Sequence, residues 1–223
     1  MNKQFKVLLY KIYRPFFIWW SNFYWITEAQ TESLTRKELA PEDYKQPEET
    51  ISEYVMRKSK EIMKYFQYIP DGPEQLGDSV PPPHHMYRIY KSQLGTPTVP
   101  YADDCDGYHA TISHFLACNG YKPYLLSIHS LNNKFGHAVC AYHANKEGDD
   151  GLWHICDYVC DYYGPDLISI IKHTYNYSTD GSWIAFLAEY DYDKYGWCRV
   201  PLDNNVYDIN DEKLNIENGL KGT

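Results

Sequence analysis

The chain has 223 residues, and its 30 Asp and Glu residues outnumber its 21 Lys and Arg residues, which gives a formal net charge of −9 at pH 7. Binding to DNA or RNA requires a clustered basic surface, so this charge balance excludes nucleic acid as an expected partner. Hydrophobic residues make up 43% of the chain and aromatic residues 17%, which is enough for a folded core and incompatible with disorder over most of the length.

The first 27 residues place basic side chains ahead of an uncharged aromatic run from 15 to 27. A signal peptide would have an apolar stretch rich in Leu and Ala and a cleavage site with small residues, and this run has neither. The run is also shorter than the roughly 20 residues that span a bilayer. Two expectations remain for residues 1–27: an aromatic segment packed on its own domain, or a helix that docks on a membrane surface or a partner protein.

The next segment, 31–48, is polar and is expected to be a connector with a short helix. Apolar residues then recur at mostly three- and four-residue steps with charged residues between them, which predicts an amphipathic helix over 49–66. Turn-forming residues from 70 to 73 end this helix, and the loop that follows through the prolines at 81–83 is not expected to hold regular structure for long.

The second half of the chain predicts one helix followed by a run of strands. Asp104 is a good N-cap, apolar residues follow at helical spacing, and Asn119-Gly120 ends the helix. Strands are expected at 124–129, 137–143, 152–158, 182–190 and 196–200, with a polar turn at 146–151 and a short helix from 164 to 173. This order predicts an α+β fold in one domain over 49–205, between an N-terminal segment and connector (1–48) and a polar C-terminal tail (206–223).

Three residues suited to thiol catalysis fall at informative places in these elements: Cys105 at a helix start, His137 at a strand start, and Asp157 near the end of the next strand. His137 and Asp157 are equally distant from residue 147, inside the polar turn, so antiparallel pairing is expected to place them opposite each other and on one face. A register shifted by one or two residues would leave them as diagonal neighbours.

The first turn of a helix favours a thiolate at Cys105, because backbone N–H groups there are unpaired and the helix dipole is positive. Asp103, Asp104 and Asp106 place like charge beside the sulfur and oppose thiolate formation. A protonated His137 in contact with the sulfur is expected to outweigh these carboxylates.

These segments resemble the transglutaminase-like cysteine peptidases, a superfamily with a papain-type core. Its nucleophile motif is similar to residues 95–110, its Gly-His-x-Val strand to 136–139, and its Asp-terminated strand to 153–157, with a weaker likeness at 66–68. The resemblance covers about 60 residues and implies an α+β core in which the nucleophile helix packs on an antiparallel sheet. The chain departs from the pattern at Asp103, where the family usually has Gly, which makes the approach to the thiol more crowded and acidic.

The resemblance implies a role for each matching residue. Cys105 would be the nucleophile, His137 the base and later the acid, and Asp157 the residue that orients the imidazole. The amide of Cys105 would hold the oxyanion together with a second donor, for which Tyr68 is the first candidate and Gln93 the second. The expected activity is acyl transfer on peptide or protein amides through a Cys thioester, as in a peptidase, deamidase or transglutaminase, and it requires no cofactor.

Two other functions remain open. One is a non-catalytic interaction module on the same fold, docking through the N-terminal aromatic segment. The other is a zinc site, because candidate ligands crowd one predicted hairpin: Cys140, His143, His154, Cys156 and Cys160. Strand alternation separates these side chains onto different faces, so the zinc site is the less expected of the two alternatives, and no metal ligand is assigned.

The chain contains six Cys residues with no regular spacing. A chain of this length can build its own core without disulfides, so free thiols in a reducing, cytoplasmic compartment are expected rather than secretion.

Overall fold

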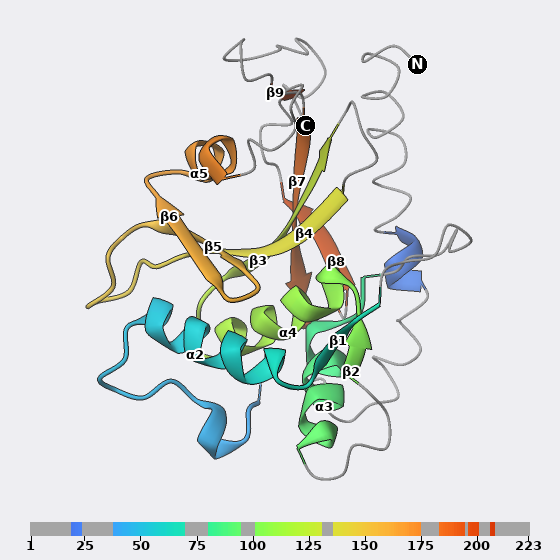
Figure 1. Cartoon of the computed structure of the whole chain (residues 1–223), viewed down its shortest axis with the longest axis vertical. Helices are drawn as coiled ribbons and strands as arrows, with labels where there is room; N and C mark the ends of the chain where they lie inside the picture. The colour runs from blue at the N-terminus through green and yellow to red at the C-terminus, as the bar shows by residue number, and fades with distance from the viewer. Residues whose placement is uncertain are drawn as a thin grey trace.

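The α+β class is confirmed: helices pack on both faces of a large antiparallel sheet (Figure 1). The computed structural model describes residues 19–23, 38–69, 80–94, 101–130, 136–174, 183–194, 196–200 and 206–207. The helices in these ranges are η1 (Pro41–Asp43), α2 (Ile51–Met63), α3 (Pro83–Gln93), α4 (Cys105–Cys118) and α5 (Leu167–Thr174). The strands are β1 (Phe66–Tyr68), β2 (Tyr101–Asp103), β3 (Pro123–Ser130), β4 (Gly136–His143), β5 (Trp153–Asp157), β6 (Cys160–Gly164), β7 (Trp183–Asp191), β8 (Gly196–Val200) and β9 (Val206–Tyr207).

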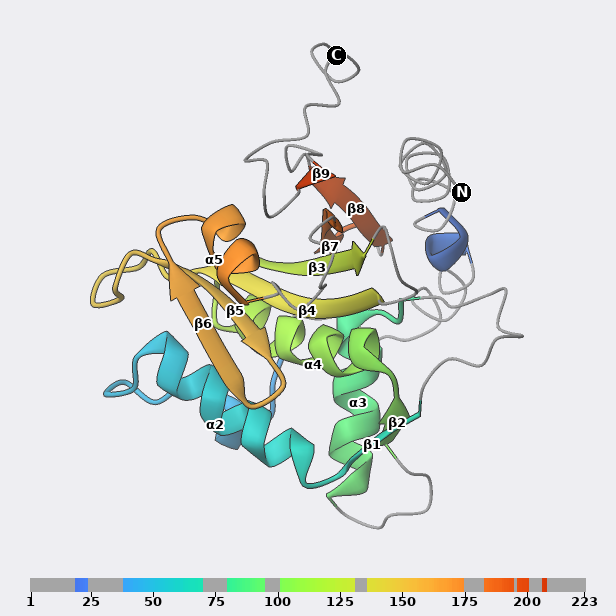
Figure 2. The same cartoon turned by 45° about the horizontal axis from the view of Figure 1, so that its top comes forward.

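The large sheet has the strand order β6-β5-β4-β3-β7-β8, and β9 also pairs with β7. All of its recorded pairings are antiparallel. Strands β1 and β2 form a separate parallel pair beside the start of α4. The strands that carry His137 and Asp157, β4 and β5, are therefore neighbours inside the sheet, and β2 leads directly into α4 (Figure 2).

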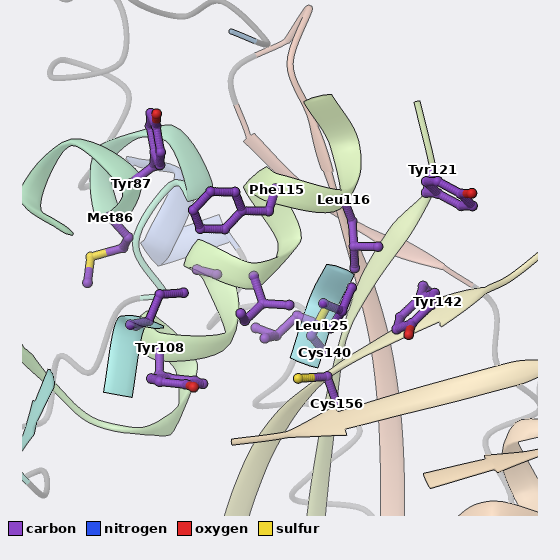
Figure 3. Packing of buried hydrophobic residues seen from close by; sticks show 14 of the residues in the cluster. Met86, Tyr87, Tyr108, Phe115, Leu116, Tyr121, Leu125, Cys140, Tyr142 and Cys156 are labelled. Carbon is purple, nitrogen blue, oxygen red and sulfur yellow. The ribbon is translucent and has the colours of Figure 1, made fainter. Parts of the chain in front are cut away.

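Helix α4 is buried on all sides because it lies between the sheet and the helices α2 and α3. Its residues Tyr108, Phe115 and Leu116 are fully buried, and Cys140 and Cys156 of the sheet pack in the same cluster (Figure 3). A second cluster, on the opposite face of the sheet, joins it to α5. Burial on every side fixes the direction of α4 and hence the position of its first residue, Cys105.

Several elements differ from the sequence prediction. The helix expected over 49–66 ends at Met63, because the chain turns and enters β1 at Phe66. Helix α3 begins at Pro83, the last residue of the expected loop, and runs through residues for which no element was predicted; proline is tolerated at the first helical position because its missing N–H would be unpaired there in any case. Strands β1, β2, β6 and β9 were not predicted; β1, β2 and β9 have only two or three residues each, and β9 falls in the segment expected to be a polar tail.

The flanking segments are partly described. Residues 19–23 are helical, and the Asn22 side chain bonds both backbone groups of Trp197 in β8, at 2.6 and 2.8 Å. This part of the N-terminal segment packs on its own domain, with Trp19 and Phe23 56% and 60% exposed. The remainder of 1–27, and all of the predicted tail except β9, lie outside the described residues. In the part of the chain that is described, no helix combines the length and apolar character needed to cross a membrane.

A buried ion pair fastens η1 to the helices behind α4. Lys58 Nζ lies 2.8 Å from Asp43 Oδ1, and both side chains are less than 5% exposed. Burial would raise the pKa of Asp43, but hydrogen bonds from Lys58, Lys91 and Tyr87 hold that pKa below its ordinary value. The connector expected at 31–48 thus contributes, from residue 38 onward, to the same core.

Candidate active site

Cys105 is the first residue of α4 and is partly exposed. The predicted N-cap is present: the Asp104 carboxylate accepts a hydrogen bond from the Asp106 backbone N–H at 3.0 Å. The sulfur is therefore held at the amide end of a helix that the core keeps rigid, where the partial positive charge favours a thiolate.

The carboxylates on either side of Cys105 are hydrogen-bonded to backbone amides. Asp103 accepts from the N–H of Asp104 at 2.8 Å, and Asp106 accepts from the N–H of Gly107 at 2.9 Å. A side chain at Gly107 would collide with the Asp103 carboxylate, so glycine is required there. The three carboxylates lie within 4.8 Å of one another, close enough to share a cation, but their amide partners account for the gathering. These bonds also offset part of the negative charge that they bring to the thiol.

His137 and Asp157 meet across β4 and β5, with Nε2 of the ring 2.8 Å from Oδ1 of the carboxylate. The predicted register was wrong by two residues, because β4 pairs Cys140 with Cys156 and so leaves His137 as a diagonal neighbour of Asp157. The Ala144–Leu152 pair at the end of the hairpin centres it at residue 148 instead of 147, which accounts for the difference. A shift by two keeps both side chains on one face, and the contact is preserved.

The sulfur of Cys105 lies against the strand that carries His137. The backbone N–H of Ala138 points at Cys105 Sγ with an N···S distance of 3.3 Å. The recorded pairing of β4 with β5 stops at Cys140, two residues away, so this N–H lies past the end of the ladder. An N–H donor favours the charged form of the sulfur. The structure thus gathers Cys105, the His137 strand and Asp157 at one place.

Tyr158, which the sequence analysis missed, lies directly beside this cluster. It follows Asp157 in the two-residue turn between β5 and β6, and its backbone is left-handed, with φ = 50°. Its ring stacks on the His137 imidazole, with centroids 5.8 Å apart. Burial raises the pKa of Tyr158, and the charge of a Cys105 thiolate adds to the rise. A tyrosine in a turn carries no sequence signal for such a role.

His109 was also missed as a site residue, although it lies four residues after Cys105 and hence on the same side of α4. Its Nδ1 is 2.6 Å from the carbonyl oxygen of Cys105, and its Nε2 accepts the backbone N–H of Tyr158 at 3.1 Å. Burial lowers the pKa of His109 to about 4, and nearby His137 adds to the lowering against the opposing effect of Asp157. The ring is therefore neutral at pH 7.

The two candidates for the second oxyanion donor lie in different places. Tyr68 is in β1 opposite Asp103, and its side chain is exposed at the end of α4 where Cys105 lies. Gln93 lies at the C-terminal end of α3 and donates to Ser92 Oγ at 3.4 Å. The position of Tyr68 favours it over Gln93.

The residues considered for zinc are engaged separately. Burial raises the pKa of Cys140 to about 12 and that of Cys156 well above its ordinary value, so both behave as apolar core residues. The two nitrogens of His154 lie 2.9 Å from Asp161 and 3.0 Å from Asp150. His143 stacks on Trp153 and bonds the Gly151 carbonyl, while Cys160 is exposed. Among the described residues, this hairpin does not direct these side chains at a common point.

Comparison with protein-family models and with curated proteins gives no match to this chain.

Proposed function

We propose that the chain is a cysteine acyl-transfer enzyme of transglutaminase-like, papain type, which attacks peptide or protein amides with Cys105. One observation carries the proposal: Cys105 Sγ accepts the amide of Ala138 at 3.3 Å, and the adjacent His137 is bonded to Asp157 at 2.8 Å. A nucleophile, a base and a group that orients the base are the parts that thiol catalysis requires.

Acylation uses the two nitrogens of His137 differently. Because Nε2 faces Asp157, Nδ1 is the nitrogen that takes the proton from the Cys105 thiol. The thiolate attacks the carbonyl carbon of the amide and forms a tetrahedral intermediate, whose oxyanion is held by the Cys105 N–H and the Tyr68 hydroxyl. The C–N bond then breaks, the amine leaves with the proton from His137, and Cys105 carries the acyl group as a thioester.

Deacylation reverses these roles. Water gives a proton to His137 and attacks the thioester carbonyl, the C–S bond breaks, and His137 returns the proton to the Cys105 sulfur. Asp157 stabilises the imidazolium that forms in each half of the cycle. An amine in place of water would give transamidation, and hydrolysis is the expected outcome.

A library of peptides that end in an acyloxymethyl ketone tests this proposal, because the ketone carbonyl takes the place of the amide carbonyl. We expect the probes to modify Cys105 selectively in the native protein, as measured by peptide mapping. In the unfolded protein, Cys105 should be modified no more than the other cysteines. The exposed Cys160 serves as an internal control in the same sample. Modification that follows exposure alone, with Cys160 reacting ahead of Cys105, would contradict the proposal.

A non-catalytic interaction module is the second candidate, and one observation favours it. Trp19 and Phe23 stack on each other with centroids 5.7 Å apart, and both are mostly exposed although residues 19–23 are anchored to β8 through Asn22. Exposed paired rings are typical of docking sites on proteins or membrane surfaces. The peptide probes separate the two candidates, because a docking module needs no activated thiol.

A further inference from the structure

His109 connects the candidate nucleophile to the turn that follows Asp157. Its Nε2 faces a backbone N–H, that of Tyr158, and so must accept. The hydrogen of the neutral ring is therefore on Nδ1, which donates to the Cys105 carbonyl oxygen at 2.6 Å. Both nitrogens of a fully buried imidazole are thus used to join the first turn of α4 to the β5–β6 turn.

The far end of this connection is a strained residue. A left-handed backbone is unfavourable for a non-glycine residue and persists only where its surroundings hold it. At Tyr158 the surroundings do so from two sides: the N–H donates to His109, and the carbonyl accepts from Ser59 Oγ in α2. The conformation directs the Tyr158 ring onto His137.

A continuous path therefore runs from the nucleophile to the base without passing through the sulfur. It leads from the Cys105 carbonyl through His109 to Tyr158, whose ring stacks on His137 and whose neighbour Asp157 bonds the same imidazole. Movement of the β5–β6 turn relative to α4 would displace Asp157 and the Tyr158 ring, the two groups that orient the His137 imidazole. The imidazole would then turn relative to the thiol, and thiol activation depends steeply on such geometry.

We propose that His109 is a positioning residue for the reaction of Cys105: its imidazole holds the Asp157–His137 pair at the distance from α4 that thiol activation needs. This inference rests on the proposed function. It assigns a role to a second histidine, which acts through Tyr158 and Asp157 and through its own edge-to-face contact with the His137 ring, whose centroid lies 6.0 Å away.

A neighbouring residue supplies a matched control. His114 is in the same helix, is also buried, and its pKa is lowered to about 3 by burial. Its bonds lead elsewhere, to the Tyr192 hydroxyl at 2.9 Å and the Glu38 carbonyl at 3.3 Å. Replacing either histidine by leucine removes one buried imidazole from α4, but only His109 belongs to the path between Cys105 and His137.

The experiment measures the rate of Cys105 alkylation by iodoacetamide between pH 5 and 9, together with thermal unfolding. For His109→Leu we expect the alkylation rate of Cys105 at pH 6 to be about tenfold lower than in the wild type, which is the effect of losing about one hydrogen bond. The pH at which the rate is half-maximal should be higher than in the wild type. His109→Gln keeps an acceptor near the Tyr158 N–H and should recover most of the rate. His114→Leu should lower the unfolding temperature and leave the pH profile of Cys105 unchanged.

The outcomes separate this inference from the function on which it rests. If the wild-type thiol depends on His137 but His109→Leu and His109→Gln both keep the wild-type pH profile, His109 is a structural residue only and the inference is overturned. If His114→Leu shifts the profile as much as His109→Leu, the effect is general and the inference again fails. If wild-type Cys105 reacts no faster than Cys160 and ignores His137→Ala, the proposed function fails and this inference fails with it. Should His109→Leu not fold, His109→Asn decides: its shorter amide can reach the Cys105 carbonyl oxygen but not the Tyr158 N–H, so the rate at pH 6 should fall as expected for His109→Leu, and a wild-type profile would overturn the inference.

Discussion

Alkylation of Cys105 at pH 6 is expected to slow by about 100-fold when His137 is replaced by alanine. An ordinary thiol has a pKa of about 8.5 and holds less than about 1% thiolate at that pH, whereas a thiol paired with imidazolium is largely ionised. The difference in rate between wild type and variant should shrink as the pH rises toward 9, because the Cys105 thiol of the variant then ionises without an imidazolium partner. Iodoacetamide labelling followed by mass spectrometry gives the rate for each of the six cysteines in one experiment.

His143→Ala is the matched control for this prediction, because His143 lies at the other end of β4 and stacks on Trp153. It should leave the Cys105 rate within about twofold of wild type. Equal loss in both variants would mean that the sheet, and not the imidazole at 137, determines the reactivity of the thiol.

Replacing Lys58 with alanine is expected to lower the free energy of unfolding by about 3 kcal/mol, measured by urea denaturation at pH 7. In the variant the Asp43 carboxylate stays buried and keeps its bonds to Tyr87 and Lys91, but it loses the Lys58 ammonium group that lies 2.8 Å from Oδ1. Removing one partner of a buried pair costs more than the pair contributes, because the remaining charge stays out of water.

The pH dependence of this loss has a defined sign. Burial raises the pKa of Asp43, but its hydrogen bonds hold that pKa below the ordinary value in the folded protein. The ionised carboxylate therefore contributes to stability above about pH 4, and this contribution is lost as the pH falls through the pKa of Asp43 in the folded state. The difference between wild type and Lys58→Ala should therefore narrow below pH 4. Lys60→Ala, at an exposed position of the same helix, should stay within about 0.5 kcal/mol of wild type, and a loss as large as that of Lys58→Ala would contradict the assignment.

The sequence was most informative where local rules determine structure. Asp104 as N-cap and the stop at Asn119 placed α4 to within a residue, since capping depends on a few neighbouring side chains. The pairing of β4 with β5 followed from alternation and the polar turn, and the even spacing of His137 and Asp157 kept them on one face although the register moved by two.

Tertiary contacts determined the rest. Helix α3 starts at the third of three consecutive prolines, and its packing against α4 stabilises it directly after a stretch whose composition favours a loop. The role of Tyr158 depends on a backbone conformation that a tyrosine adopts only under constraint from α2 and α4. The four-residue spacing from Cys105 could have indicated His109 as a site residue, but no sequence pattern indicates its hydrogen bond with Tyr158 in the β5–β6 turn.

The pH dependence of Cys105 alkylation in the native wild-type protein, with Cys160 as the reference thiol in the same sample, tests the central claim most directly. A thiol activated by His137 and by the amide end of α4 should reach its half-maximal rate well below pH 8.5, and at a lower pH than Cys160, which is exposed at the start of β6. Coincident profiles for the two cysteines would contradict the claim that Cys105, His137 and Asp157 form a catalytic site.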